Sequence, residues 1–316
     1  MGSKETLRLD GRVVAITGGG RGLGREYALM VASRGAAVVV NDIDVPREVE
    51  KYLRSDRSNG DSVAKAVAKE IESLGGLAIE VVSDVSTPEG ASAVIDAALA
   101  AFGRIDAVVN NAAVRSVGLI EEVTAEDFEA ALAAQVTGTY LMVQAAWPHF
   151  RAENFGRIVN IGSGVGLVYG APEHAAYAAA KGAILGLTRV MASEGSPYGI
   201  AANCLLPNAE TQGASNPLGG SHGGGLAVDV APAVCWLVHP DMPSSGEVFA
   251  YKAGNMRSVF VSIGDGYQTV PSEPVSPELW RDHWQAVCDR TPVLSPRSGE
   301  DYNSYRDAQR ERAAMS

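Results

Sequence analysis

The sequence has 316 residues, 46% of them hydrophobic, and its 26 basic and 37 acidic residues give a formal net charge of −11. This length and apolar content are enough for one large domain or two small ones with a substantial core. An acidic surface repels phosphates and anionic lipids, so we expect neither nucleic acid nor a membrane as a general partner.

The ends of the chain and its cysteines carry no signal for secretion or metal binding. The segment Met1–Asp10 is polar and lacks the apolar core of a signal peptide. No apolar run approaches the roughly 20 residues that cross a bilayer. Three cysteines, at positions 204, 235 and 288, are far apart and lack metal-ligand spacing. We therefore expect reduced thiols, no bound metal and a cytoplasmic location.

Short apolar runs alternate with helical patterns along the chain. Val13–Ile16 predicts a buried strand; a glycine-rich turn follows, then a helical pattern at Arg25–Arg34 and a second apolar run at Ala36–Val40. Strand, helix and strand in this order form the unit of a parallel sheet. Further strands are predicted at Leu77–Val82, Ala107–Val109, Arg157–Ile161 and Ala201–Leu205, and helices at Val63–Ser73, Ala91–Phe102, Ala125–Trp147 and Ala175–Glu194. We expect an α/β fold with one doubly wound parallel sheet and helices on both faces.

Two segments interrupt this alternation. Pro46–Asp61 is charged and is expected to run over the surface before the next helix. Asn208–Gly225 is rich in Gly, Ser and Asn, which predicts a mobile loop. Because this loop is almost uncharged, it suits a largely apolar substrate, over which it could act as a lid.

The chain changes character after Gly266. A proline-punctuated stretch leads to an amphipathic helix predicted at Pro277–Asp289, and the polar tail Ser295–Ser316 is expected to be disordered. We divide the chain into a main domain, residues 1–265, and a C-terminal extension, residues 266–316. Two interpretations of the extension stay open: disorder, or packing at a subunit interface or over the active site.

The glycine-rich turn covers Thr17–Gly24 and lies between a predicted strand and a helix. Glycines at 18, 22 and 24 let the backbone turn sharply and approach a pyrophosphate, and the following helix offers free N–H groups at its positive end. The spacing differs from the usual G-x-G-x-x-G pattern, and an ordinary glycine-rich turn is the alternative. The strand–turn–helix context favours a dinucleotide site.

Asp42 ends the second predicted strand. Its carboxylate can accept hydrogen bonds from ribose hydroxyls and would repel a 2′-phosphate, which favours NAD over NADP. Arg21 argues the other way, because a guanidinium in the turn could reach such a phosphate. Burial makes like-charge repulsion costly, so Asp42 receives more weight and NAD is the expected cofactor. A simple strand-end cap is the alternative role for Asp42.

Tyr177 and Lys181 are one helical turn apart and therefore project from one face. A free tyrosine, with a pKa near ~10, is a poor base at neutral pH, but a nearby ammonium favours the phenolate. Ser163 follows a predicted strand at the edge where open α/β sheets bind ligands, and its hydroxyl can stabilise charge on a substrate oxygen. Together these residues predict proton-transfer chemistry.

The motifs taken together resemble one family. Thr-Gly-x-x-x-Gly-x-Gly at 17–24, Asn-Asn-Ala-Ala at 110–113, Ser163 and Tyr177-x-x-x-Lys181 occur in the order found in the short-chain dehydrogenase/reductase family, and the resemblance spans residues 10 to about 265. It implies a single Rossmann-type domain, hydride transfer at a Ser–Tyr–Lys site with a nicotinamide cofactor, and a homodimer or homotetramer.

The resemblance also implies roles for individual residues. The expected catalytic residues are Ser163, Tyr177, Lys181 and Gln135. The expected cofactor contacts are Gly18, Arg21, Gly22, Leu23, Gly24, Asp42, Asp84, Val85, Asn111, Ala112, Tyr177, Lys181 and Pro207. The expected substrate contacts are Ser163, Tyr169, His174 and Tyr177. Without the resemblance, Asp84 would be interpreted as a turn cap and Asn110 as a hydrogen bonder at a strand end. For Tyr169 and His174 the residues themselves leave two roles equally open, contact with the substrate and a surface or packing role.

The sequence departs from the family pattern at three places. Gln135 stands where the family has an asparagine that helps to hold a water in the proton relay beyond the lysine. The interval from Ser163 to Tyr177 is one residue longer than the commoner one, which would reshape the substrate wall near Tyr169. Pro207 is followed by Asn208 instead of glycine. Gln135 keeps the amide but is one methylene longer, so it puts the proton relay in doubt, while hydride transfer is still expected.

The Pro-Asn pair and the sequence Val-Asn-Asp at 40–42 resemble one branch, the (3R)-hydroxyacyl-CoA dehydrogenase domain of the peroxisomal type 2 multifunctional enzyme. We expect NAD-dependent interconversion of a secondary alcohol and a ketone on a largely apolar small molecule. A (3R)-hydroxyacyl-CoA dehydrogenase is the alternative enzyme, and Lys252, Arg257 and Arg281 could then bind the phosphates of coenzyme A. A non-catalytic dinucleotide sensor is the alternative from another class.

Overall fold

The computed structural model describes residues 6–43, 62–114, 116–209, 225–269, 275–291, 293–296 and 299–315. The chain forms two compact units, Met1–Ser258 and Val259–Ser316, and each is described by itself. The expectation for Pro46–Asp61 lies outside the described residues, as does that for most of the loop Asn208–Gly225.

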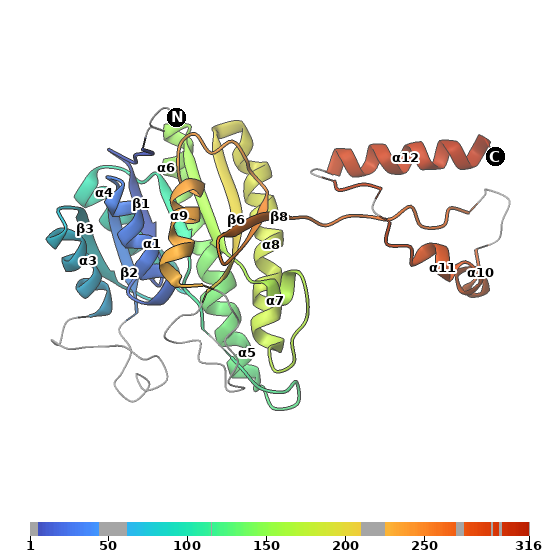
Figure 1. The fold of residues 1–316 in the computed structure, drawn as a ribbon, viewed down its shortest axis with the longest axis horizontal. Helices are drawn as coiled ribbons and strands as arrows, with labels where there is room; N and C mark the ends of the chain where they lie inside the picture. Colours follow the sequence, from blue (N-terminus) through green and yellow to red (C-terminus); the bar gives the residue numbers. More distant parts are fainter. Residues whose placement is uncertain are drawn as a thin grey trace. The chain divides into compact units, whose positions relative to one another are not determined.

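The first unit is built on a sheet whose strand order is β3-β2-β1-β4-β5-β6-β7-β8 (Figure 1). Its strands are β1 (Val13–Ile16), β2 (Ala37–Asp42), β3 (Leu77–Val82), β4 (Ala107–Asn110), β5 (Gly156–Ile161), β6 (Ile200–Asn208), β7 (Val248–Lys252) and β8 (Asn255–Val259). All neighbours from β3 across to β7 pair in parallel. The expected doubly wound α/β fold is confirmed, and the strand order reverses between β1 and β4.

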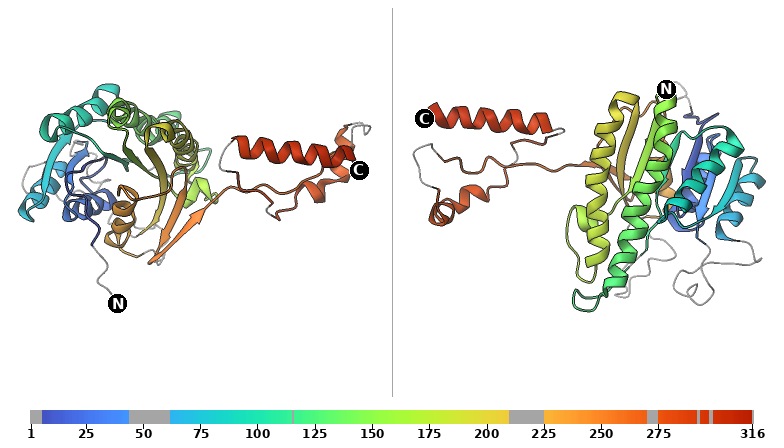
Figure 2. Two further views of the ribbon diagram at one scale, coloured as in Figure 1. Left: turned by 90° about the horizontal axis from the view of Figure 1, so that it is seen from above. Right: turned by 180° about the vertical axis from the view of Figure 1, so that it is seen from behind.

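Helices lie on both faces of this sheet (Figure 2). They are α1 (Gly22–Ser33), α3 (Val63–Ser73), α4 (Pro88–Phe102), α5 (Ala125–Leu132), α6 (Gly138–Glu153), α7 (Gly164–Leu167), α8 (Ala175–Gly195) and α9 (Ala227–Leu237). β1 shows why the strands are apolar throughout: Val14 and Ile16 pack in a core with α1, α3 and α9, whereas Val13 and Ala15 pack in a second core with α4 and α6. Both faces are buried, as in other parallel sheets.

The helix predicted at Ala125–Trp147 is interrupted in the structure. A π-helical turn, η1 (Ala133–Thr137), separates α5 from α6, and α6 continues to Glu153 with Pro148 inside it. Hydrophobic periodicity could not indicate the turn, since a single wide turn shifts the pattern by only one residue. After α8, one 3₁₀ turn (Ser196–Tyr198) leads into β6.

The second unit differs from the expectations for the C-terminal extension. The helix predicted at Pro277–Asp289 is two short helices, α10 (Pro277–Asp282) and α11 (Trp284–Val287), divided at His283, whose ring stacks on Tyr267. The tail expected to be disordered, Ser295–Ser316, contains helix α12 (Gly299–Met315). Its polar composition suggested disorder, but acidic residues in its first turn favour a helix by opposing the helix dipole.

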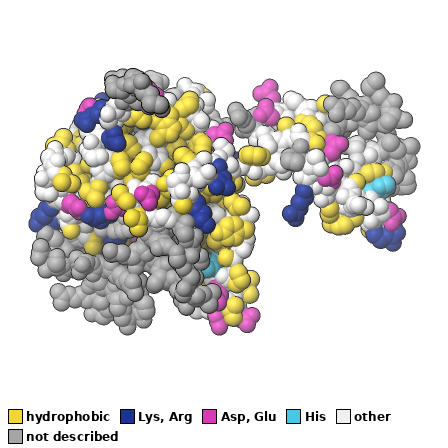
Figure 3. Space-filling view, viewed as in Figure 1, with side chains coloured by type: hydrophobic (Ala, Val, Ile, Leu, Met, Phe, Trp, Pro, Cys, Tyr) yellow, Lys and Arg dark blue, Asp and Glu magenta, His cyan; other side chains and the backbone are white. Residues whose placement is uncertain are grey.

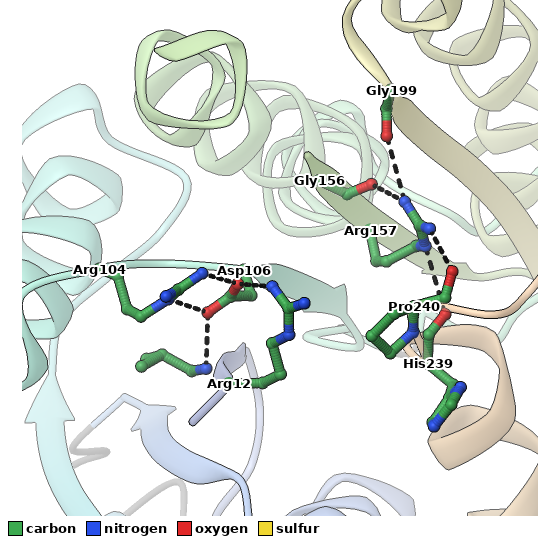
Figure 4. Close-up of polar contacts among 9 residues, drawn as sticks. Arg12, Arg104, Asp106, Gly156, Arg157, Gly199, His239 and Pro240 are labelled. Carbon is green, nitrogen blue, oxygen red and sulfur yellow. Dashed lines mark hydrogen bonds and ion pairs between the residues drawn. The ribbon is translucent and has the colours of Figure 1, made fainter. Parts of the chain in front are cut away.

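Charged side chains hold the amino ends of the central strands together. Asp106, just before β4, accepts hydrogen bonds from Arg12 at 2.7 Å and from Arg104 (Figure 4). Arg157, at the start of β5, is 8% exposed. Its guanidinium donates to the carbonyls of Gly156, Gly199, His239 and Pro240. These groups lie at the sheet edge opposite the glycine-rich turn, so they stabilise the fold at a distance from it.

Tyr27 on α1 gives a test of the core. Its side chain is fully buried, burial raises the pKa of its hydroxyl, and that hydroxyl has no hydrogen-bond partner among the described residues. Because an unpaired buried hydroxyl costs about 1 kcal/mol or more, Tyr27→Phe should raise the free energy of unfolding by about 1 kcal/mol in urea denaturation. Tyr140→Phe on the exposed side of α6 is the control and should change it by less than about 0.5 kcal/mol. A loss of stability in Tyr27→Phe would contradict the prediction.

Candidate active site

The expected site residues gather at one edge of the sheet. The glycine-rich turn follows β1, Asp42 ends β2, Asn111 follows β4, Ser163 follows β5, and Pro207 lies near the end of β6, paired with Tyr251 of β7. Parallel strands end at the same edge, and this one includes the point between β1 and β4 where the strand order reverses. Open α/β sheets bind ligands at such a point.

The geometry of the turn requires its glycines. Gly18 and Gly22 have φ of +61° and +49°, in the left-handed region. A Cβ at Gly24 would lie 2.1 Å from the Gly18 carbonyl oxygen, so no larger residue fits there. Helix α1 begins at Gly22, and its N-cap residue Arg21 makes no side-chain capping bond. The turn and the helix N-terminus together form a cradle that fits a pyrophosphate, the central group of a dinucleotide.

Asn111 and Thr17 fasten the turn to β4. The Thr17 hydroxyl oxygen accepts from the backbone N–H groups of Asn111 and Ala112, both at 3.0 Å. The Asn111 side-chain amide donates to the carbonyls of Thr17 at 3.0 Å and Gly18 at 3.1 Å. Sequence reasoning expected Asn111 and Ala112 to line the cofactor and missed this structural role. Thr17 is far from these two residues in the sequence, so their structural role becomes visible only when β1 and β4 pair.

Asp42 and Arg21 form an ion pair. Arg21 Nη2 lies 2.8 Å from Asp42 Oδ1, and the same carboxylate accepts from the N–H groups of Gly20 at 3.0 Å and Ile43 at 2.9 Å. Burial raises the pKa of Asp42, and Arg21 opposes that rise. From the sequence, Asp42 favours NAD and Arg21 favours NADP as separate side chains, whereas in the structure the two form one ion pair.

Asp84 and Val85 follow β3. Asp84 is exposed, and its carboxylate accepts from the backbone N–H of Ser86 at 2.9 Å and from the Ser86 hydroxyl at 2.7 Å. This confirms the turn-capping interpretation of Asp84. Val85 is 5% exposed and packs against Gly138 at the start of α6, where a Cβ would lie 3.2 Å from its side chain. A contact of either residue with a cofactor stays a prediction.

Lys181 is buried beside Tyr177 on α8. The Lys181 ammonium donates to the Ile161 carbonyl at 2.6 Å and lies 5.7 Å from the centre of the Tyr177 ring. Its side chain is 3% exposed, and burial lowers the pKa of Lys181 to about 8, an effect that neighbouring Cys204 opposes. The Ile161 carbonyl comes from the last residue of β5, so the strand that leads to Ser163 also anchors the lysine.

Ser163 is the N-cap of α7, and its hydroxyl oxygen accepts from the Val165 N–H at 3.2 Å. Tyr169 is 57% exposed, and its ring lies next to Gly164, where a Cβ would be 3.0 Å from the ring edge. His174 precedes α8; its ring centroid is 6.1 Å from that of Tyr177, and its Nδ1 lies 2.6 Å from the Pro172 carbonyl oxygen. The structure thus places Tyr169 near Ser163 and His174 near Tyr177.

Gln135 lies in the π-helical turn and is 1% exposed. Its side-chain amide donates to the carbonyls of Val114 at 3.0 Å and Ala131 at 3.3 Å. Asn110, at the end of β4, donates to the Asn160 side chain at 2.9 Å, which confirms the interpretation of Asn110 as a hydrogen bonder at a strand end.

Hydrophobic side chains are exposed on segments that follow the strands of this edge. They are Val117, Leu119 and Ile120 after β4, Val168 and Tyr169 after β5, and Leu226 and Val228 after β6. In the space-filling view, hydrophobic side chains reach the surface of the first unit between polar ones (Figure 3). The segments that carry polar groups of the candidate site therefore also expose apolar side chains.

None of the helices that the structure describes is long and apolar enough to span a membrane. Within the same residues, no three His, Cys, Asp or Glu side chains are grouped in a way that could hold a metal ion. The three cysteines are unpaired with one another, and only Cys288 is exposed.

The fold, the dinucleotide cradle and the Tyr–Lys pair are those of a nicotinamide-dependent α/β oxidoreductase. The model of the short chain dehydrogenase family matches residues 12–215. The chain belongs to this family of oxidoreductases, whose members bind nicotinamide dinucleotides.

Relatives and solved structures agree with this assignment. The chain is 35% identical over 294 residues to the peroxisomal multifunctional enzyme type 2 of Mus musculus, covering 92% of this chain but only 38% of that enzyme. A short chain dehydrogenase from Mycobacterium avium superposes with a TM-score of 0.77 at 30% identity, over 91% of this chain and 99% of that one. Full-length peroxisomal multifunctional enzyme type 2 from Drosophila melanogaster gives a TM-score of 0.76 at 26% identity, over 96% of this chain and 50% of that one. The expected likeness to this branch is confirmed.

Proposed function

We propose that the protein interconverts a secondary alcohol and a ketone on a largely apolar small molecule, with NAD as cofactor. The observation that carries this proposal is the Lys181 ammonium, buried and held by the Ile161 carbonyl, beside the Tyr177 ring at the edge that carries the glycine-rich turn. The exposed apolar side chains after β4, β5 and β6 support an apolar substrate. Asp42 supports NAD, since a carboxylate disfavours a 2′-phosphate.

Each proposed catalytic residue has one task. NAD, when bound, supplies the hydride acceptor, and its reduced form the donor. Tyr177 takes the hydroxyl proton of the alcohol, or returns it to the ketone oxygen in the reverse direction. The nearby ammonium of Lys181 favours the phenolate form that accepts this proton. The Ser163 hydroxyl donates a hydrogen bond to the substrate oxygen and stabilises the charge that develops on it. Tyr169 and His174 are proposed to contact the substrate.

Tyr177→Phe tests the proposal most directly. Loss of the hydroxyl removes the proton acceptor, so the rate of NADH formation with the best alcohol should fall by about 10²- to 10⁴-fold while the protein stays folded. Absorbance at 340 nm measures the rate, and Tyr140→Phe at an exposed position of α6 is the matched control. Full activity in Tyr177→Phe would refute this mechanism. Cofactor binding without turnover on any substrate would favour the non-catalytic sensor.

A (3R)-hydroxyacyl-CoA dehydrogenase is the second candidate. The likeness to the type 2 multifunctional enzymes favours it, although this chain spans only 38% of the mouse enzyme. Lys252 and Arg257 of the first unit are the proposed partners for the phosphates of coenzyme A. A panel of acyl-CoA esters, steroids and simple cyclic alcohols, run with NAD and NADP, separates the two candidates. Turnover of cyclic alcohols with none of the acyl-CoA esters would eliminate the second.

We further propose that residues 1–265 form the dehydrogenase domain, that residues 266–316 form an extension of it, and that the protein is a cytoplasmic homodimer or homotetramer. Light scattering of the whole chain, compared with a chain that lacks residues 277–316, determines the oligomeric size and whether the extension contributes to it.

A further inference from the structure

A short segment connects the cofactor turn to the start of the catalytic helix. We define the connecting segment as residues 111–114 and 116–118. At its first end, the N–H groups of Asn111 and Ala112 donate to the Thr17 hydroxyl. At its other end, the Gly118 N–H donates to the Glu173 carbonyl at 2.9 Å, and Gly118 forms a β-bridge with His174. The segment therefore joins Thr17 to a residue that lies just before Tyr177.

Gln135 binds the middle of this segment. The amide NH₂ has two hydrogens, and its two partners are the carbonyl oxygens of Val114 and Ala131. A carbonyl can only accept, so the nitrogen of the amide must face these two oxygens. The amide oxygen of Gln135 is buried without a partner in the described part of the chain. Both amide hydrogens of Gln135 are thus engaged in holding backbone.

The π-helical turn explains how Gln135 reaches Val114. The turn widens the helix at Ala133–Thr137, and Gln135 is its only buried residue. Its backbone carbonyl is also engaged, because it accepts from the Thr139 hydroxyl at 2.7 Å. Such turns inside α-helices are frequent at functional sites. Here the turn directs a long amide side chain toward the connecting segment.

We propose that Gln135 is a positioning residue that fixes the connecting segment between the glycine-rich turn and helix α8, and that it does not carry protons. The expected effects on KM and kcat rest on the proposed function, whereas the positioning itself rests on the hydrogen bonds of Gln135 described above. Asparagine at this position is one methylene shorter and could not keep both carbonyl contacts. The glutamine is therefore the residue whose length this arrangement requires.

Gln135→Asn distinguishes positioning from proton relay. If Gln135 positions the segment, the KM for NAD should rise about tenfold, the loss expected for one or two hydrogen bonds, while kcat and the pH profile stay unchanged. A relay role predicts the reverse: Gln135→Asn keeps wild-type kinetics, and Gln135→Met lowers kcat and shifts the pH profile. Gln144→Asn on the exposed side of α6 is the matched control, since it makes the same chemical change at an exposed side chain, whereas Gln135 is buried.

A second measurement does not depend on turnover. Hydrogen exchange at the amides of Asn111, Ala112 and Gly118 should accelerate about tenfold in both Gln135→Asn and Gln135→Met, because their segment has lost its central contact. Calorimetry should show NAD binding about tenfold weaker. Unchanged exchange and unchanged NAD affinity in both variants would overturn the positioning role, as would relay-type kinetics. Absence of turnover in the wild type would count against the proposed function alone.

Discussion

Lys181→Met should abolish catalysis and yet stabilise the fold. Without the ammonium the Tyr177 phenolate loses the nearby positive charge that favours it, so the oxidation rate should fall by about 10³-fold or more. The stabilisation follows from burial: the pKa of Lys181 is lowered from 10.5 to about 8, a shift that corresponds to a cost on the order of 3 kcal/mol for keeping the ammonium in the folded protein. Methionine has no such cost, but it leaves the Ile161 carbonyl unpaired, which reduces the gain in the free energy of unfolding by about 1 to 2 kcal/mol. We expect a net gain of about 1 to 2 kcal/mol in the free energy of unfolding at pH 7.

The pH dependence of stability gives the same prediction a second test. Between about pH 8 and 10.5 the unfolded chain holds a proton on Lys181 that the folded protein has released. Burial of the Lys181 ammonium therefore lowers the free energy of unfolding by its full amount below pH 8. This loss disappears as the pH rises toward 10.5. Lys181→Met should lack this rise.

Urea denaturation of both proteins at several pH values measures the effect of Lys181→Met. Lys69→Met on helix α3 is the control and should leave activity and the pH dependence as in the wild type. A Lys181→Met protein that is less stable than the wild type at pH 7 would contradict the burial argument, whereas one that keeps activity would contradict the catalytic role.

Asp42→Asn should shift cofactor preference from NAD toward NADP. In the wild type the Asp42 carboxylate engages Arg21, so the guanidinium cannot serve a 2′-phosphate. The substitution removes a negative charge from the place where that phosphate would bind and releases Arg21, while the Asn carbonyl oxygen can still accept from the Gly20 N–H. One charge–charge interaction of this kind is worth about 3 kcal/mol near a protein surface. The ratio of kcat/KM for NADP to kcat/KM for NAD should therefore rise by about 10²-fold.

A double variant tests the part played by Arg21. If the released guanidinium binds the phosphate, adding Arg21→Met to Asp42→Asn should remove most of the gain with NADP and leave the rate with NAD as in Asp42→Asn. Asp96→Asn on the exposed side of α4 makes the same change in charge away from the turn and should leave the ratio unchanged. Equal use of both cofactors by the wild type would show that Asp42 does not discriminate between them.

Hydrophobic periodicity and chain order were enough to predict the architecture and the sheet edge that carries the glycine-rich turn. Runs such as Val13–Ile16 and Ala36–Val40 are apolar throughout, a pattern typical of a sheet covered on both faces, and helical patterns between them indicate parallel strands. Parallel strands have their carboxyl ends at one edge, so the glycine-rich turn, Asp42 and Ser163 had to lie along the same edge of the sheet. Each of these inferences needs only local periodicity and chain order.

The tertiary structure alone decided how the side chains pair. The ion pair of Arg21 with Asp42 depends on the pairing of β1 with β2, and the bond from Lys181 to the Ile161 carbonyl depends on where α8 lies against β5. No local pattern predicts that Lys181 is buried or that Gln135 reaches Val114, because both contacts join segments about 20 residues apart in the chain. Hydrogen bonds and charges act over a few ångströms in space. Their partners are therefore known only when packing has fixed which segments lie together.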